Sequence, residues 1–127
     1  MTKYVLDASA FLALINNEEG ASKVEKVLPH SIMSSVNVSE CVVVLGSIGM
    51  LDQEIETIFK DLLSEIISFD MNQAFIAGFL RKETKTKGLS FGDRACIALG
   101  KMMKLPVMSA DKVWAEIDCG VHVELIR

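Results

Sequence analysis

The chain has few of the residues on which several common kinds of catalytic site depend. Its two histidines, His30 and His122, have no cysteine, serine or second histidine at a spacing typical of a metal or nucleophile site. Its three cysteines are far apart and form no CxxC pattern, which argues against a disulfide framework and a thiolate zinc site. Serine–histidine and cysteine–histidine hydrolase sites are therefore not indicated.

Long apolar runs are missing as well. The longest apolar stretches, such as residues 10–15 and 42–45, are far shorter than the ~20 residues of a membrane-spanning helix. The opening MTKYVLDASA lacks a signal-peptide pattern, because Asp7 interrupts the region that should stay apolar. At 127 residues, the chain fits one domain over residues 1–127. We therefore expect a single-domain cytoplasmic protein that does not enter a membrane.

The charged residues are distributed unevenly along the chain. The net charge is −4, but residues 1–80 carry 4 basic and 11 acidic side chains, whereas residues 81–112 carry 8 basic and 3 acidic ones. A basic segment in an acidic protein indicates that one face meets a polyanion. Charge alone is equally compatible with a solvated loop and helix face.

Short apolar segments alternate with amphipathic ones, which predicts strands alternating with helices. Strands are expected at residues 3–6, 31–34, 66–69, 106–109 and 121–126. Helices are expected at residues 8–17, 18–28, 36–48, 51–65, 71–84, 90–104 and 112–117, with a loop at 85–88. Because the strands are apolar rather than alternating, we predict an α/β fold: a central parallel sheet in a three-layer αβα sandwich. The helix at 36–48 is almost entirely apolar and is expected to be buried on most sides.

Four acids, Asp7, Glu40, Asp93 and Asp111, interrupt apolar or small-residue stretches. Taken singly, the three aspartates are better explained as helix caps, and residues 90–93 fit a capping box. Glu40 lies inside the apolar helix, where an unpaired buried charge would be costly. Its alternative explanation is a place at the exposed edge of that helix.

The four acids have a different meaning when they are considered together. Residues just past the carboxyl ends of parallel strands gather along one edge of the sheet, where such folds bind ligands. Carboxylates crowded there would raise one another's pKa values unless cations offset their charge. Oxygen ligands without histidine or cysteine select Mg²⁺ or Mn²⁺, which can activate water for attack on a phosphodiester. The pattern therefore predicts a metal-dependent hydrolase.

Three segments of the chain resemble the PIN-domain nucleases, in particular the VapC-type toxins of prokaryotic toxin–antitoxin pairs. They are YVLDASAFLALINNEEG, SSVNVSECVVVL and GLSFGDRACIALGKMMKLPVMSAD. The resemblance spans nearly the whole chain, and the order Asp, Glu, Asp, Asp matches the acidic positions of the family. It implies that these four acids are catalytic and hold Mg²⁺ or Mn²⁺, with Ser9 and Ser109 in support.

The resemblance also implies an activity and partners. Such toxins are similar in being site-selective endoribonucleases that are usually homodimeric and are inhibited by a cognate antitoxin protein in the active-site groove. Asn37 stands where many relatives have threonine, a departure that is not expected to abolish activity. Phe11, Leu14 and Ile15 are candidates for contact with an antitoxin helix, although a core role is the stronger expectation for each.

The basic segment fits an RNA substrate. The residues expected to hold RNA phosphates lie just before or beside the third acid: Arg81, Lys82, Lys85, Lys87 and Arg94. Because no aromatic residue lies between Phe79 and Phe91, base stacking is not expected within that stretch.

Two other classes of protein remain as alternatives. A PIN fold retained as a binding or assembly module with little catalysis is disfavoured by the intact acids. A receiver-like phospho-acceptor domain needs an acidic pair after the first strand and a lysine after the last, whereas Asp7 stands alone and no lysine follows. Phosphatases of the DxD type are disfavoured because Ser9 is the residue two positions after Asp7.

Overall fold

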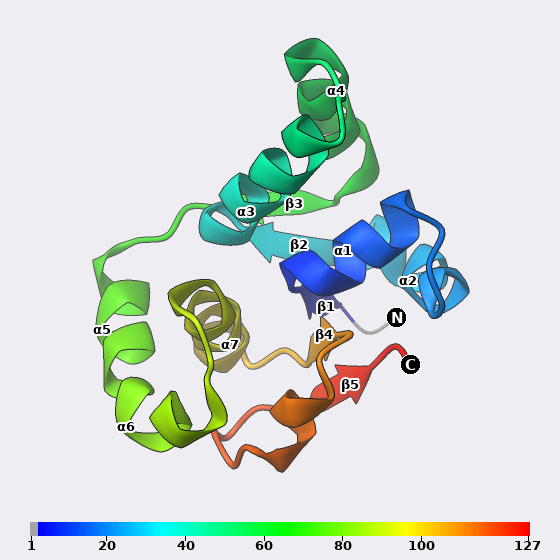
Figure 1. Cartoon of the computed structure of the whole chain (residues 1–127). Helices are drawn as coiled ribbons and strands as arrows, with labels where there is room; N and C mark the ends of the chain where they lie inside the picture. The colour runs from blue at the N-terminus through cyan, green and yellow to red at the C-terminus, as the bar shows by residue number, and fades with distance from the viewer. Residues whose placement is uncertain (1–2) are drawn as a thin grey trace.

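The computed structural model describes residues 3–127, in which a five-stranded parallel sheet is flanked by helices (Figure 1). The strands are β1 (Tyr4–Leu6), β2 (Ser31–Ser34), β3 (Glu65–Ile67), β4 (Val107–Ser109) and β5 (Val123–Leu125). They lie in the order β3-β2-β1-β4-β5, and every pairing is parallel. β1 is therefore the central strand, and its carboxyl end lies between those of β2 and β4.

The helices follow the predicted order with small shifts at their ends. They are α1 (Ala8–Ile15), α2 (Ala21–Val27), α3 (Ser35–Ser47), α4 (Asp52–Leu62), α5 (Met71–Phe79), α6 (Arg81–Thr84) and α7 (Phe91–Met103). The described residues also form three 3₁₀ helices: η1 (Leu28–His30), η2 (Lys85–Lys87) and η3 (Lys112–Glu116). The segment at 85–88, expected to be a loop, is largely η2. The helix predicted at 71–84 is divided at Leu80, a buried residue that still donates its N–H to the carbonyl of Ile76.

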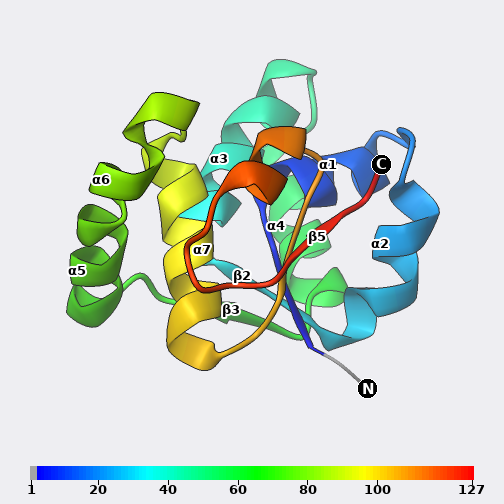
Figure 2. The same cartoon turned by 90° about the horizontal axis from the view of Figure 1, so that it is seen from below.

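The two faces of the sheet support two separate cores. Because successive strand residues point to opposite faces, Leu6 joins the cluster that includes Phe11 of α1 and Phe59 of α4. Val5 joins the other cluster, which includes Ile97 of α7. Figure 2 shows α1 and α2 on one side of the strands and α5, α6 and α7 on the other. The predicted three-layer αβα arrangement is confirmed.

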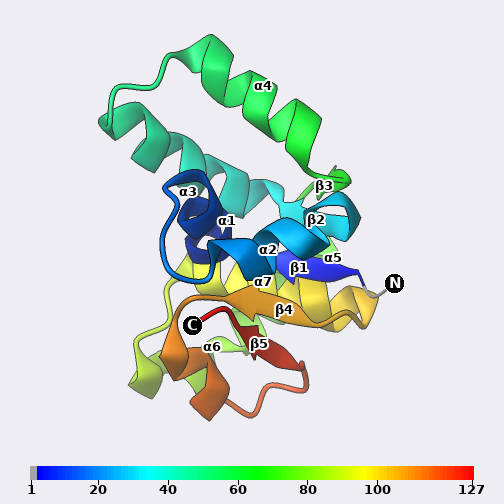
Figure 3. The same cartoon turned by 90° about the vertical axis from the view of Figure 1, so that its right-hand side faces the viewer.

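Helices α3 and α4 form a hairpin that extends away from the sheet (Figure 3). Val43 is 70% exposed, and Ile48 and Leu51 at its tip are also exposed. The expectation that α3 is buried on most sides is therefore wrong. Within α3, only Asn37, Cys41 and Leu45 are buried. An apolar helix packs only where another element covers it, and in the described part of the chain α3 is covered along one side only.

The order of the strands also tests the receiver-like alternative. A receiver-like domain has the strand order 2-1-3-4-5, which differs from the order 3-2-1-4-5 seen in this sheet. The receiver-like alternative is therefore excluded.

No helix within residues 3–127 is long and apolar enough to cross a bilayer.

Candidate active site

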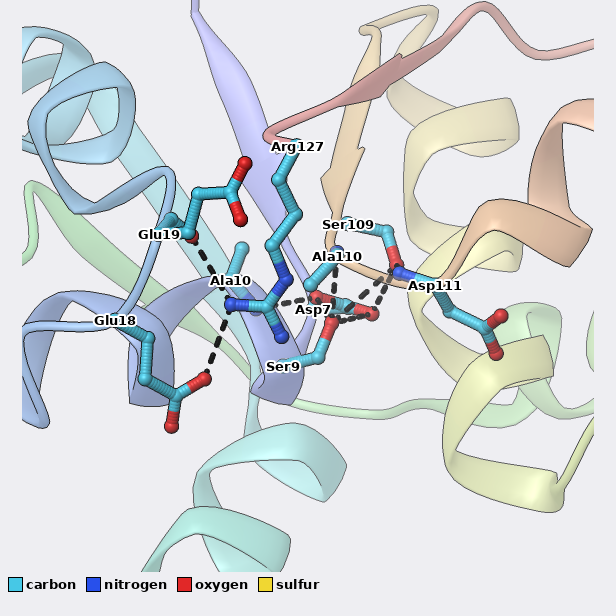
Figure 4. A network of polar contacts seen from close by, with 9 residues as sticks. All are labelled: Asp7, Ser9, Ala10, Glu18, Glu19, Ser109, Ala110, Asp111 and Arg127. Atoms are coloured by element: carbon cyan, nitrogen blue, oxygen red, sulfur yellow. Dashed lines mark hydrogen bonds and ion pairs between the residues drawn. The ribbon is translucent and has the colours of Figure 1, made fainter.

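Asp7 lies at the carboxyl end of the central strand and is 4% exposed. Its Oδ1 accepts a hydrogen bond from Ala10 N at 2.8 Å, so the predicted capping of α1 is confirmed. The Ser9 hydroxyl lies 2.8 and 2.9 Å from the two carboxylate oxygens, and the Ser109 hydroxyl donates to Oδ2 at 2.7 Å (Figure 4). Both residues predicted to support the site therefore contact its first acid.

The same hydroxyls connect Asp7 to the segment that follows β4. Ser9 Oγ accepts a hydrogen bond from Ala110 N at 2.9 Å, and Ser109 Oγ accepts one from Asp111 N at 3.0 Å. Asp111 Oδ1 accepts from Val113 N at 3.1 Å and so caps η3, as the sequence predicted. The Asp111 side chain points away from Asp7 (Figure 4), which places it at the rim of the site.

Glu40 is held by an amide three residues earlier on the same helix face. Asn37 Nδ2 donates to Glu40 Oε1 at 2.8 Å and to the carbonyl of Gly92 at 3.0 Å. Because both neighbours are hydrogen-bond acceptors, the amide must turn its NH₂ group toward them. Asn37 Oδ1 is then buried without a partner among the described residues. The Glu40 carboxylate lies against Gly92, where the Cβ of any other residue would overlap it.

Asp93 follows Gly92 in the first turn of α7. Ser90 N donates to Asp93 Oδ2 at 2.9 Å and Asp93 N donates to Ser90 Oγ at 3.2 Å, so the predicted capping box is confirmed. The cap uses only one carboxylate oxygen. Among the described residues no hydrogen bond reaches Asp93 Oδ1, Glu40 Oε2 or Asp111 Oδ2, and these oxygens are available to a ligand.

Burial and neighbouring charges both shift pKa values in the site. Burial, with a smaller contribution from the charge of Asp93, raises the pKa of Asp7 to about 6, although the hydrogen bonds from Ser109, Ala10 and Ser9 lower it. Burial also raises the pKa of Asp93, and the charge of Asp111 adds to this effect. The buried thiol of Cys96 has a pKa raised first by burial and then by the charges of Asp7, Asp93 and Glu40. The charges of Asp7, Asp93 and Glu40 therefore all act on the Cys96 thiol.

The acids converge without touching. Within residues 3–127, no three carboxylate, histidine or cysteine side chains are close enough together to hold a metal ion. The available donors are nevertheless oxygens of carboxylates, serine hydroxyls and the Asn37 amide. This set suits a hard divalent cation better than zinc or copper, so the chemistry of the donors fits Mg²⁺ or Mn²⁺.

The five basic residues expected to contact RNA do not form one uniform group. Arg94 donates to the carbonyl of Ala77 at 2.9 Å, which fixes its guanidinium in the protein. Lys87 pairs with Glu116 at 3.3 Å. The other three are exposed and form no ion pair within the described chain: Arg81, Lys82 and Lys85.

Sequence reasoning missed two residues that shape the site. Asn37 was noted only as a departure from the related sequences, and Gly92 only as part of a motif. The spacing of Asn37 and Glu40, three residues apart on one helix, was the available signal for their contact. The need for glycine at position 92 depends on a residue 52 positions away, so no local pattern could have revealed it.

A family and several solved structures resemble the chain. The PIN domain family matches residues 4–119. Among curated proteins, none matches the chain significantly. A DNA-bound VapBC complex from Salmonella typhimurium is 19% identical, with a TM-score of 0.73 and coverage of 100% of both chains.

Two further structures have the same fold. VapBC2 from Rickettsia felis, bound to promoter DNA, is 20% identical with a TM-score of 0.76 and coverage of 98% of each chain. VapC20 from Mycobacterium tuberculosis, described as a sarcin-ricin loop cleaving toxin, is 14% identical with a TM-score of 0.72, covering 89% of this chain and 94% of its own. At these identities the likeness concerns the fold.

The contact between Gly92 and Glu40 predicts the effect of a small substitution. In Gly92→Ala, the new methyl group overlaps the Glu40 carboxylate, so we expect unfolding free energy to fall by about 1–3 kcal/mol in urea titrations. Gly78→Ala, in an open position on α5, should be neutral or stabilising. Adding Glu40→Ala to Gly92→Ala should recover most of the loss. Equal stability of the two alanine variants would contradict the contact.

The raised pKa of Asp7 predicts a pH-dependent cost to stability. A carboxyl group with a higher pKa in the folded state contributes stability that is complete below its unfolded value, near 3.8, and is lost as pH rises through about 6. Asp7→Asn removes this cost and should stabilise the metal-free protein at pH 7.5 by on the order of 1–2 kcal/mol.

Urea unfolding in chelator at pH 7.5 and 5.0 measures this effect, and the advantage of Asp7→Asn should shrink at the lower pH. Asp70→Asn is the matched control, because Asp70 also caps a helix but is exposed. An Asp7→Asn protein that is less stable than wild type at pH 7.5 would show that the ionised carboxylate is favourable where it lies.

Proposed function

The chain belongs to the PIN domain family, and from that premise we propose that it is a metal-dependent endoribonuclease and the toxin of a toxin–antitoxin pair. It hydrolyses RNA phosphodiester bonds at the carboxyl edge of its sheet and acts in the cytoplasm. The observation that carries this proposal is geometric: the Ser109 hydroxyl joins the Asp7 carboxylate to the backbone of Asp111, and the Glu40 carboxylate lies against Gly92, directly before Asp93.

The four acids hold the metal in this proposal. None of the three ion pairs in the described chain involves them. When bound, Mg²⁺ or Mn²⁺ supplies a Lewis acid that lowers the pKa of water and offsets charge on the phosphodiester. Ser9 and Ser109 orient the Asp7 carboxylate, and Asn37 fixes that of Glu40.

The RNA backbone lies along the basic segment. Arg81, Lys82 and Lys85 are the exposed cations that contact phosphates, and Lys87 joins them when its pairing with Glu116 opens. That pair is exposed and therefore weak. Arg94 also has a structural role, because its guanidinium group anchors α7 to the carbonyl of Ala77 on α5.

The partners are a cognate antitoxin and a second copy of the chain. The solved structures with this fold include VapBC complexes and a toxin–antitoxin complex from Klebsiella pneumoniae, which supports an antitoxin here. The α3–α4 hairpin offers an apolar groove of about 560 Å³ for an amphipathic helix of that protein. Its lining residues are Val38, Val42, Asp52, Ile55, Glu56, Phe59, Lys60 and Ile66. The earlier candidate Phe11 is fully buried against Phe59 and is a core residue.

The alternative function is a PIN fold that binds RNA or protein with little catalysis. Cleavage assays decide between the two. We expect the purified chain to cleave RNA in Mg²⁺ or Mn²⁺, to lose activity in EDTA and to regain it when metal is restored. Asp93→Asn should lower the rate by at least about 100-fold, since loss of even an outer-shell partner of a metal ligand costs 10–100-fold.

Asp61→Asn is the control, because it removes an exposed carboxylate on α4, far along the chain from every acid of the site. Its activity should equal that of wild type. Full activity in EDTA would refute the metal-dependent mechanism, and folded protein without any cleavage would favour the binding module.

The antitoxin groove makes a separate prediction. Val42→Lys places a charge in the groove and should abolish complex formation with the cognate antitoxin, while RNA cleavage by the free toxin persists. Size-exclusion chromatography and inhibition of cleavage measure the two properties. Met71→Lys, at an exposed position on α5, is the matched control. If Met71→Lys alone breaks the complex, the antitoxin binds α5 rather than the hairpin.

A further inference from the structure

Of the six phenylalanines of this chain, two are buried, Phe69 is partly buried and three are exposed. Phe11 and Phe59 stack on each other in the core, with ring centroids 4.9 Å apart. Phe75, Phe79 and Phe91 are 55%, 69% and 50% exposed. All three belong to α5 and α7, on the side of the sheet that carries the basic segment. Large exposed aromatic side chains of this kind mark interaction surfaces.

Phe91 is distinguished by its position. It is the first residue of α7, directly before Gly92 and two residues before Asp93. The Gly92 carbonyl is bound by Asn37, and the Glu40 carboxylate lies against the same glycine. The Phe91 ring is therefore attached to the backbone that forms the wall of the acid site.

The ring is held in place although half of its surface is exposed. Phe69 packs its ring perpendicular to that of Phe91, with centroids 5.4 Å apart. The Arg94 guanidinium carbon lies 5.9 Å from the Phe91 centroid, and Arg94 is itself anchored by Ala77. A ring fixed in this way loses little conformational freedom when a flat ligand stacks on it.

We infer that Phe91 is a stacking platform for an unpaired base of single-stranded RNA, next to the phosphate that is cleaved. This assignment rests on the proposed function and deepens it, because it specifies the form of RNA and a residue that selects it. Bases stack on aromatic side chains only where they are free of a duplex. The exposed cations Arg81, Lys82 and Lys85, which precede Phe91 in the chain, supply the phosphate contacts that accompany such stacking.

The test measures base stacking directly. A 12-nucleotide single-stranded RNA carries 2-aminopurine, whose fluorescence is quenched when it stacks, and binding is followed in Ca²⁺ in place of Mg²⁺. Phe91→Leu keeps the apolar volume and removes the aromatic face, so affinity should fall about 5- to 100-fold and the quenching should disappear. Phe91→Tyr should retain both. Double-stranded RNA should bind wild type and Phe91→Leu equally.

Phe75→Leu is the control, because it removes an equally exposed ring from the middle of α5. An equal loss of affinity in Phe75→Leu would overturn the assignment. A Phe91→Leu protein that changes its sedimentation but not its RNA affinity would also overturn it, because the ring would then contact a second copy of the chain. Cleavage by wild type in Mg²⁺ separates the two proposals. If the wild-type protein cleaves RNA but does not quench 2-aminopurine fluorescence, the stacking assignment is refuted and the proposed function is not. If it neither binds nor cleaves RNA, the proposed function is refuted.

Discussion

The site depends on one buried carboxylate, Asp7, being held at the end of the central strand. Its oxygens receive hydrogen bonds from Ala10 N and from the hydroxyls of Ser9 and Ser109. Those hydroxyls then accept from backbone N–H groups of the segment after β4, so one carboxylate joins β1, α1 and β4. The hydrogen bonds do not fully offset burial, because the pKa of Asp7 is still raised to about 6. An ionised Asp7 is a local cost that a nearby cation would relieve.

Helix capping and ligand binding are compatible in this arrangement. A carboxylate has two oxygens, and the caps at Asp93 and Asp111 each use one. Glu40 caps no helix, but it too has one hydrogen-bonded and one available oxygen, because Asn37 binds Oε1 and leaves Oε2 available. In each case the structural hydrogen bond sets the direction of the second oxygen. The choice between cap and ligand, which seemed to divide these acids when only the sequence was considered, is therefore not exclusive.

The parts of the fold that could be predicted from sequence are those set by local chemistry. The caps at Asp7, Asp93 and Asp111 all form, because a polar residue before an apolar helix has few other roles. The burial of α3 was predicted wrongly, because apolar composition does not say which element will cover a helix. The contact of Glu40 with Gly92 was missed for the same reason, since it depends on how α3 and α7 meet.

The charge distribution explains why the acids and the basic segment belong to one proposed mechanism. Without a metal, the acid cluster repels an RNA phosphate, and the basic side chains of α6 and η2 can attract only the flanking backbone. A divalent cation inverts the sign of the local field at the acids. In the proposed mechanism, the phosphate to be cleaved would then be drawn to the acids while the flanking phosphates contact the basic segment. Binding of RNA at the site should therefore depend on the metal more strongly than binding along the basic segment.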